Sequence, residues 1–346
     1  MTLRNLVNKE ELKEKLQAEK IKRITISFYK YVKISNPEEL RDKLYQEWSN
    51  LEVFGRIYLA KEGINAQFNV SEKNFNKFKN QLYSYKEFED IPFKIAVEDD
   101  GKSFYKLTIK VKDKIVADGL DDSTFDVTNT GKHLTAKEFN EAMKDPDTIV
   151  VDMRNQYESE VGHFEGAICP DADTFREELP MVKEELKGKE DKKILLYCTG
   201  GIRCEKASAY LKHNGFEDTK QLHGGIIEYK KQVNQEGLEC KFKGKNFVFD
   251  ERVGERITKE VISKCHQCRN TCDIHTNCKN DDCHLLFIQC DKCKEKFQGC
   301  CTPKCMEIAS LAIEEQRKLR KGRKKEECLS VYKSRLRPKL QELVNN

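Results

Sequence analysis

The sequence predicts a multidomain protein that combines an α+β module, an α/β domain with a mainly parallel sheet, and a cysteine-rich metal-binding region with a basic helical tail. Three observations lead to this expectation. The chain has 346 residues, whereas one domain usually takes about 100 to 200. The spacing of its apolar residues indicates a different kind of structure before residue 113, between residues 134 and 239, and from residue 240 onward. Ten of its 15 cysteines fall between Cys265 and Cys305.

The first 112 residues predict an α+β module of the ferredoxin-like, or acylphosphatase-like, kind. After a polar helix, the pattern reads strand, helix, strand, strand, helix, strand. Pro37 at a first helical position, and Asn36 and Ser71 as caps, support the helix starts. Such modules bind RNA, peptides or nothing, so this region alone does not decide the function. The predicted helices are 8–20, 37–51 and 72–85, and the predicted strands are 24–32, 56–60, 66–70 and 93–97, the last extended by 107–111.

A turn-rich connector at 113–133 precedes a predicted α/β domain at 134–239. Gly119 and Gly131 help to break any period in the connector. Short apolar strands then alternate with helical segments, which indicates a mainly parallel sheet with helices on both faces. Functional sites in such folds form beyond the carboxyl ends of the strands. The predicted strands are 149–151, 194–197 and 219–222, and the predicted helices are 136–143, 174–186, 202–213 and 226–233.

Cys198 follows one of these strands and precedes a helix, in the six-residue loop CTGGIR at 198–203. Backbone N–H groups in the turn and at the helix start, together with Arg203, favour an anion and should lower the thiol pKa. Two glycines let the backbone curl without side-chain clashes. The sequence therefore predicts Cys198 as the catalytic residue, in an anion-binding or substrate-binding loop formed by Thr199, Gly200, Gly201, Ile202 and Arg203.

The same loop admits other interpretations. Four residues separate Cys198 from Arg203, whereas a thiolate phosphatase loop usually has five, so the loop suits a persulfide or another small adduct better than a phosphate monoester. A merely structural cysteine at a strand end is disfavoured by the glycines and the arginine in the same turn. Cys204 and Cys169 are expected to be core cysteines, although Cys204 would also be placed to resolve an oxidised Cys198.

Residues 240–346 predict a cysteine-rich zinc-binding region. Cys265 and Cys268 form one C-x-x-C pair, and Cys290 and Cys293 form another. Tetrahedral zinc takes four such ligands, and structural zinc would fold a segment too short and polar to build its own core. The spacing leaves the other ligands open, and an iron–sulfur cluster or disulfides are the alternatives. Further candidates are Cys272, Cys278, Cys283, Cys300, Cys301 and Cys305, with His266, His275 and His284 as possible nitrogen donors.

Positive charge gathers near the C-terminus. The net charge is only +4, yet seven of the nine residues from Arg317 to Lys325 are basic. Such runs are often solvated helix faces, so contact with nucleic acid and simple solvation are equal alternatives at this point. The candidates for RNA contact are Arg317, Lys318, Arg320, Lys321, Arg323, Lys324 and Lys325.

The N-terminal residues lack the apolar stretch of a secretion signal, and no segment is long and apolar enough to span a bilayer. These features predict a cytoplasmic protein without membrane contact, whose thiols stay reduced. Many reduced thiols point to metal sites and nucleophiles before disulfides.

Several motifs resemble a rhodanese domain: DMR at 152–154, GHFEGA at 162–167, the 198–203 loop followed by CEKAS at 204–208, and LHGGI at 222–226. More narrowly, GRIYLAKEGIN at 55–65 and FVFDER at 247–252 resemble the rhodanese-containing tRNA uridine hydroxylase family, over nearly the full chain. The resemblance implies oxygen-dependent 5-hydroxylation of the wobble uridine of tRNA, with Cys198 essential. The family pattern would have a cysteine at the position of Asn246. The sequence therefore leaves undecided which residue would be the partner of Cys240.

The resemblance also implies partners and co-substrates. A tRNA would present its anticodon loop, with one base splayed out to reach Cys198 and the basic C-terminal end on phosphates. Molecular oxygen would be the co-substrate, and no glycine fingerprint for a flavin or nicotinamide follows any strand. His163 and Glu165 could suggest non-haem iron, but in rhodanese domains such residues usually fix loops and pair with an arginine such as Arg154. The alternative functions are a sulfurtransferase carrying a persulfide on Cys198 and a non-enzymatic zinc adaptor.

Overall fold

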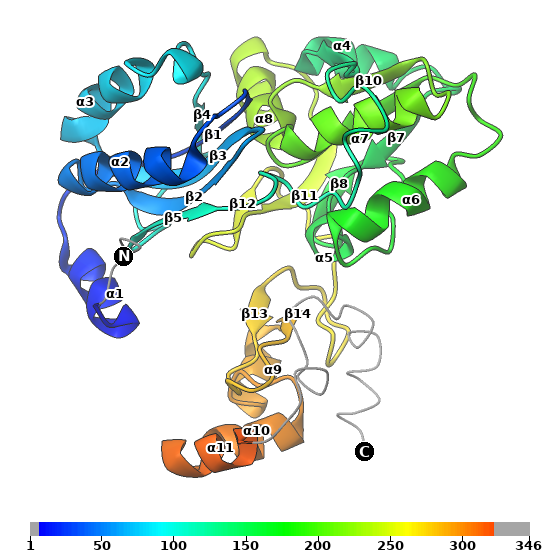
Figure 1. The fold of residues 1–346 in the computed structure, drawn as a ribbon. Coiled ribbons are helices and arrows are strands. Elements are labelled where there is room, and N and C mark those ends of the chain that lie inside the picture. The colour runs from blue at the N-terminus through cyan, green and yellow to red at the C-terminus, as the bar shows by residue number, and fades with distance from the viewer. Residues whose placement is uncertain (1–6, 322–346) are drawn as a thin grey trace. The chain divides into compact units, whose positions relative to one another are not determined.

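The computed structural model describes residues 7–321 (Figure 1). The chain divides into two compact units, which are described separately. The first comprises Met1–Val150, Gly188–Glu239 and Val248–Arg256, and the second comprises Val151–Lys187, Cys240–Phe247 and Ile257–Asn346. Each unit is thus assembled from segments that are distant in the sequence. No helix within the described part of the chain combines the length and the apolar character needed to cross a bilayer.

The N-terminal part of the first unit has the predicted α+β architecture. Its five-stranded sheet has the order β4-β1-β3-β2-β5, in which β1 and β2 pair antiparallel with β3 and β2 pairs parallel with β5. The strand–helix–strand–strand–helix–strand order from β1 to β4 confirms the expected ferredoxin-like arrangement. The elements are α1 (Lys9–Ala18), β1 (Arg23–Tyr31), α2 (Pro37–Asn50), β2 (Phe54–Ala60), β3 (Gly63–Ser71), α3 (Glu72–Tyr83), the 3-10 turn η1 (Lys86–Phe88), β4 (Lys94–Ile95) and β5 (Leu107–Val111).

Aromatic side chains join both helices to the sheet in this module. The Phe68 ring of β3 lies 4.7 Å from that of Phe78 in α3, and Trp48 in α2 lies 5.2 Å from Phe78, measured between ring centroids. All three side chains are fully buried. The Trp48 indole N–H donates to the Gln81 side-chain oxygen at 2.8 Å, so its one polar atom is satisfied. Burial of these rings holds the sheet in place. Its strands β1 and β4 contribute side chains to the candidate active site.

Three sequence expectations for this module were wrong in detail. Residues 107–111 do not extend the strand at 93–97, because β5 pairs with β2 at the opposite edge of the sheet. Strand β4 is shorter than expected, since the Val97 N–H donates to the Glu255 carboxylate at 3.0 Å and leaves the ladder. Ser71 stands at the N-cap of α3 without a side-chain capping bond, whereas Asn36 accepts from the Glu39 N–H at 3.2 Å as predicted.

The rest of the first unit carries the α/β part of the chain. Strand β10 pairs parallel with β6 on one side and with β9 on the other, within a four-stranded sheet of order β6-β10-β9-β7. This confirms the predicted parallel sheet, although β6 begins inside the expected connector. The elements are β6 (Lys132–Leu134), α4 (Ala136–Ala142), β7 (Ile149–Asp152), β9 (Ile194–Tyr197), α7 (Ile202–His213), β10 (Thr219–Leu222), α8 (Gly225–Glu236) and β12 (Gly254–Arg256).

The second unit combines one antiparallel strand pair with the cysteine-rich region. Strands β8 and β11 pair with Phe164 opposite Phe242, whose rings meet edge to face at 5.4 Å. The cysteine-rich region holds a hairpin of β13 and β14, followed by three short helices. The elements are α5 (Gln156–Ser159), β8 (Gly162–Phe164), α6 (Phe175–Glu185), β11 (Phe242–Phe247), β13 (His275–Asn277), β14 (Leu286–Ile288), α9 (Asp291–Lys296), α10 (Pro303–Ser310) and α11 (Ile313–Arg320).

Candidate active site and metal centres

Cys198 lies where the fully buried strand β9 ends and turns toward α7. Its side chain has no exposed surface. The turn is closed by Gly201, which has a φ of 95° and stands at the N-cap of α7, a conformation that glycine adopts without strain. The next loop packs directly on the turn, since the Ile226 N–H donates to the Cys198 carbonyl at 3.0 Å. The sulfur is therefore held in a preformed backbone cradle.

Groups that prefer an anion surround the Cys198 sulfur. The Gly201 N–H donates to Sγ at 3.1 Å. Complete burial raises the pKa of Cys198, but the hydrogen bond from the Cys204 thiol, the charge of Arg203 and neighbouring N–H groups together lower it to about 6. At neutral pH the side chain is then mostly a thiolate, the nucleophilic form of cysteine.

Cys204 lies in the first turn of α7 and is as deeply buried as Cys198. Burial, and the hydrogen bond that it gives to Cys198, raise the pKa of Cys204 well above its ordinary value. It therefore stays protonated and donates to the neighbouring thiolate. The sequence analysis expected a core cysteine here, and the structure adds this hydrogen bond to that role.

The N-terminal module reaches the same loop through two tyrosines of β1. The Tyr29 hydroxyl donates to the Glu205 carboxylate at 2.9 Å, and a methyl group placed on Gly201 would lie 3.0 Å from that hydroxyl oxygen. The Tyr31 hydroxyl donates to the Ile202 carbonyl at 3.4 Å. Two side chains of an antiparallel sheet thus border the start of α7.

A buried ion cluster fixes α7 to the N-terminal module and to the connector. The Lys206 ammonium is almost fully buried and lies 2.9 Å from the Glu62 carboxylate and 2.7 Å from that of Asp122. Lys114 joins the cluster at 2.8 Å from the same Asp122 side chain. Glu62 belongs to the 55–65 motif and Lys206 to the 204–208 motif, so two motifs far apart in sequence are joined by one ion pair. Such pairs set the position of an element more than they add stability.

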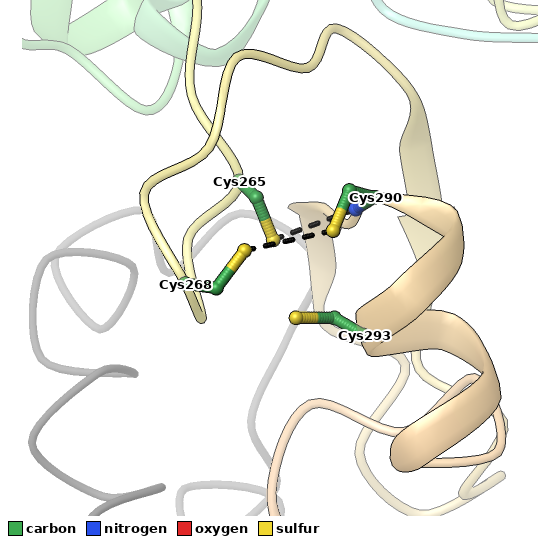
Figure 2. A group of neighbouring side chains, drawn as sticks. All are labelled: Cys265, Cys268, Cys290 and Cys293. Atoms are coloured by element: carbon green, nitrogen blue, oxygen red, sulfur yellow. Dashed lines mark hydrogen bonds between the residues drawn. The ribbon is translucent and has the colours of Figure 1, made fainter.

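The first metal centre gathers four sulfurs from two loops and the start of α9. Figure 2 shows the side chains of Cys265, Cys268, Cys290 and Cys293 pointing toward a common centre. Their sulfurs all lie within 4.8 Å of one another, and those of Cys268 and Cys290 are 3.6 Å apart. Tetrahedral zinc with Zn–S bonds of about 2.3 Å requires sulfurs about 3.8 Å apart, so this set fits the ion.

Backbone N–H groups support the charge of this first group. The Cys290 N–H donates to the Cys265 sulfur at 3.4 Å. Burial raises the pKa of Cys265, but backbone N–H groups, first that of Cys290, lower it to about 7. Such outer contacts orient ligands and favour the thiolate form that a metal requires.

A second group of the same kind lies among the remaining cysteines. The sulfurs of Cys278, Cys283, Cys301 and Cys305 also lie within 4.8 Å of one another, and Cys301 is 3.6 Å from both Cys283 and Cys305. All four are buried beside Leu285 and Phe287 in a small core. Among residues 7–321, Cys272 and Cys300 belong to neither group, and the three candidate histidines are likewise outside both. The cysteines of this described range are all free thiols rather than disulfides.

Comparisons with known proteins match all three regions. Residues 23–115 match the UPF0176 acylphosphatase-like domain, 135–232 the rhodanese-like domain, and 243–306 the rhodanese C-terminal family. A protein of Leptospira interrogans named tRNA uridine(34) hydroxylase is 59% identical over 99% of this chain and 93% of its own length. A protein of the same name from Photorhabdus laumondii is 53% identical over 99% of this chain and 97% of its own length. One from Enterobacter sp. is 55% identical over 93% of this chain and 92% of its own length.

The chain belongs to the tRNA uridine(34) hydroxylase family. The matched length spans the N-terminal module, the Cys198 loop and the cysteine-rich region. The family resemblance expected from the sequence motifs is thereby confirmed.

The position where the family pattern suggested a cysteine belongs to a buried polar network in the second unit. Arg154 is fully buried and holds the Asp152 carboxylate at 2.6 Å, and it donates to the Asn246 side-chain oxygen at 3.4 Å. Asn246 thus joins this network, while the Cys240 thiol donates to the Phe242 carbonyl at 3.6 Å.

The pair that could have suggested non-haem iron has other partners. The His163 Nδ1 lies 2.9 Å from the Ser159 carbonyl, and Glu165 lies 3.2 Å from the Lys243 ammonium. Neither residue belongs to a metal-capable group among the described residues. Glu165 thus pairs with a lysine, where an arginine such as Arg154 was expected.

The basic residues proposed for RNA contact are partly within the described chain. Arg317, Lys318 and Arg320 lie on α11, and Lys321 follows it. Arg317, Lys318 and Lys321 are exposed, while Arg320 is partly buried and lies 3.9 Å from Asp281. Arg323, Lys324 and Lys325 lie outside the described residues. The visible part of the run therefore leaves three cations available to a partner.

Sequence reasoning missed the residues that the N-terminal module brings to the Cys198 loop. Tyr29 lies 176 residues before its partner Glu205. A sheet residue of ordinary type carries no local signal of such a contact. Only the pairing of the 55–65 and 204–208 motifs in one family could have indicated that the two regions meet.

Proposed function

We propose that this protein hydroxylates carbon 5 of uridine 34 in tRNA, with dioxygen as co-substrate and the Cys198 thiolate as the catalytic group. The thiolate in its cradle of N–H groups, in a chain 53% and 59% identical to proteins named for this activity, carries the proposal. A tRNA-modifying enzyme works where tRNA is, so we also place the protein in the cytoplasm.

The chemistry begins with the sulfur. Addition of the thiolate to uracil C6 forms an S–C6 bond and moves the C5–C6 electron pair into an enolate, which makes C5 nucleophilic. Reaction at C5 with dioxygen leaves one oxygen atom as the new hydroxyl group and the other as water. The balance requires two electrons and two protons from an external reductant. Loss of the C5 proton to solvent and of the sulfur from C6 then restores the C5–C6 double bond and the free thiolate.

The base must leave its stack to reach a sulfur that lies at the bottom of a loop. Uridine 34 belongs to the anticodon loop, where single-stranded bases are splayed out and read most readily. Exposed cations such as Arg317 and Lys318 would hold phosphates and position the RNA without reading its sequence.

We further propose that both cysteine groups hold structural zinc. Spacings of 3.6 Å between sulfurs, with all-sulfur ligand sets, suit tetrahedral zinc. Zinc with four protein ligands has no open position, so its contribution is to fold the region that carries α11. The assigned ligands are Cys265, Cys268, Cys290 and Cys293 in the first site and Cys278, Cys283, Cys301 and Cys305 in the second.

The decisive experiment is a nucleoside profile by mass spectrometry of tRNA from a strain that lacks this protein, complemented with the wild type, Cys198→Ser or Cys169→Ser. We expect 5-hydroxyuridine-derived nucleosides to return with the wild type and with Cys169→Ser, and to stay absent with Cys198→Ser. Loss of thiolated nucleosides instead would establish a sulfurtransferase. An unchanged profile with Cys198→Ser would leave only the zinc adaptor.

A further inference from the structure

Lys94 of the N-terminal module lies across both loops that hold Cys198. It belongs to the short edge strand β4 and pairs with Ser27 of β1. A methyl group placed on Gly200, in the Cys198 loop, would lie 3.9 Å from the Lys94 Cδ. One placed on Gly224, in the facing loop, would lie 3.6 Å from its Cε. The Lys94 side chain therefore lies beside the backbones of Gly200 and Gly224, in both loops that hold Cys198.

Among the described residues, no anionic side chain contacts the Lys94 ammonium. It lies 4.4 Å from the centre of the Tyr29 ring, and among residues 7–321 it makes no hydrogen bond and no ion pair. Burial lowers its pKa to about 8, against the opposing effect of Cys198 and of the Glu205 and Glu228 carboxylates. A partly buried charge with no partner costs free energy, and a purely structural residue would not require such a charge. The Lys94 ammonium thus lies beside the Cys198 loop, where the reaction is expected to form negative charge.

Two N–H groups of the loop, those of Gly201 and Arg203, already donate to the Cys198 sulfur. The Gly201 N–H points at Sγ, and Arg203 is buried beside it in the first turn of α7. When the thiolate adds to C6, the sulfur becomes a neutral thioether and the charge moves through C5 and C4 to the uracil O4. The Lys94 ammonium can supply a donor for that oxygen from outside the loop. Donors aimed at developing charge are the largest single source of catalysis in many enzymes.

We propose that Lys94 is a catalytic residue of the Cys198 site, whose ammonium stabilises the oxyanion formed on uracil O4 when the thiolate adds to C6. The inference rests on the function proposed above. It makes the N-terminal module part of the active site rather than a separate RNA-binding domain. The lysine changes no oxidation state and keeps its proton, so the charge that leaves the sulfur returns when the S–C6 bond breaks.

The test compares Lys94→Met and Lys94→Arg with the wild type under single-turnover conditions, with tRNA bound in advance. We expect Lys94→Met to lower the rate of 5-hydroxyuridine formation by about 100-fold, as for loss of one oxyanion donor. The tRNA Kd should stay within about 3-fold, and Lys94→Arg should recover most of the rate because it restores the cation. Lys30→Met is the matched control, since Lys30 lies on the neighbouring strand and donates to the Glu89 carbonyl away from the loop.

A pH profile separates a catalytic cation from a structural one. The groups facing Lys94 are Cys198, Glu205 and Glu228, the Tyr29 ring, and His133, whose pKa is raised by its hydrogen bond to Glu205. The wild-type rate should fall above pH about 8 as Lys94 loses its proton, whereas Lys94→Arg should not show this decline. A wild type that forms no 5-hydroxyuridine would remove the proposed function itself. An active wild type matched by Lys94→Met within about 3-fold, or an alkaline decline that persists in Lys94→Arg, would overturn the role of Lys94 alone.

Discussion

The Cys198 loop and the two C-terminal cysteine groups use the same atom in opposite ways. In the loop, the Cys198 sulfur accepts a hydrogen bond from the protonated Cys204 thiol and lies beside Arg203 and peptide N–H groups, which together bring its pKa to about 6. In the groups, four sulfurs lie within 4.8 Å of one another. In the first arrangement the protein supplies the positive charge beside the sulfur, whereas in the second a bound metal ion could supply it.

Backbone donors do not account for this difference, because both regions have them. The N–H groups of Cys290 and Cys301 donate to cluster sulfurs at 3.4 Å and 3.5 Å, and the Gly201 N–H donates to Cys198 at 3.1 Å. What differs is the number of sulfurs and the presence of a fixed guanidinium. On the proposed assignments, a cysteine of this chain is reactive where the protein itself supplies the positive charge, and it is structural where a bound metal ion would supply that charge.

The largest expected effect is the loss of a metal ligand. Cys290→Ser should remove one metal equivalent per chain and unfold the cysteine-rich region, since structural zinc contributes on the order of 10 kcal/mol to the folding of such segments. Metal analysis and denaturant unfolding measure both effects. Cys272→Ser, outside both groups, is the control and should keep the full metal content. Equal metal content in both variants would refute the assignment of the first centre.

Gly225→Ala tests whether close backbone packing builds the thiolate loop. A methyl group there would lie 2.5 Å from the Cys198 carbonyl oxygen, at a φ of 68°. We expect a loss of about 3 kcal/mol in the free energy of unfolding, from clash and strain together. Gly237→Ala has a similar φ of 64° but open space around it, so it should cost only about 1 kcal/mol. Equal losses in chemical denaturation would show that the packing between the loops is unimportant.

Titration of Cys198 tests the electrostatic half of the comparison. The thiol is protonated below its pKa of about 6, so alkylation should rise with pH through that value and level off above it, and hydroxylation should rise through the same value before its decline above pH about 8. Subtracting the signal of Cys198→Ser removes the contribution of the other cysteines. Arg203→Met should move the midpoint upward by roughly one to two pH units, because the thiolate loses its fixed cation. A midpoint near that of an ordinary thiol in the wild type would contradict the proposed nucleophile.

The smallest effect is expected at α11. Replacing Arg317 and Lys318 by alanine should weaken tRNA binding a few-fold and lower the slope of log affinity against log salt by about 0.7 for each phosphate that the protein no longer neutralises. Binding titrations at several salt concentrations measure the slope. The Cys198 titration should not change, since the helix only positions the RNA. An unchanged slope would assign this basic run to solvation.

Local patterns predicted much of this fold. Alternating apolar residues located β1 and β3, and Asn36 and Pro37 marked the start of α2, because these signals act over a few residues. The strand–cysteine–glycine–glycine order placed Cys198 at the end of β9 for the same reason. Pairings over long distances were not predictable, as with β8 and β11, or β5 beside β2.

The candidate site was predicted where short motifs mark its residues. The loop at 198–203 was identified in full, but Tyr29 and Lys94 come from a different module and carry no local mark of their position. The C-x-x-C pairs were identified, whereas the grouping of Cys278 and Cys283 with Cys301 and Cys305 depends on how the β13–β14 hairpin folds back. Tertiary packing, rather than residue type, decides such assignments.

The ligands of the two cysteine groups are interleaved along the chain, since Cys278 and Cys283 fall between Cys268 and Cys290. During synthesis, the first group is complete once Cys293 has left the ribosome, while the second must wait for Cys301 and Cys305. A metal held by the first group ties both ends of the segment that contains Cys278 and Cys283, and so shortens the loop that the second must close. The interleaved order of the two groups therefore couples their formation, because closing either group reduces the entropy lost in forming the other.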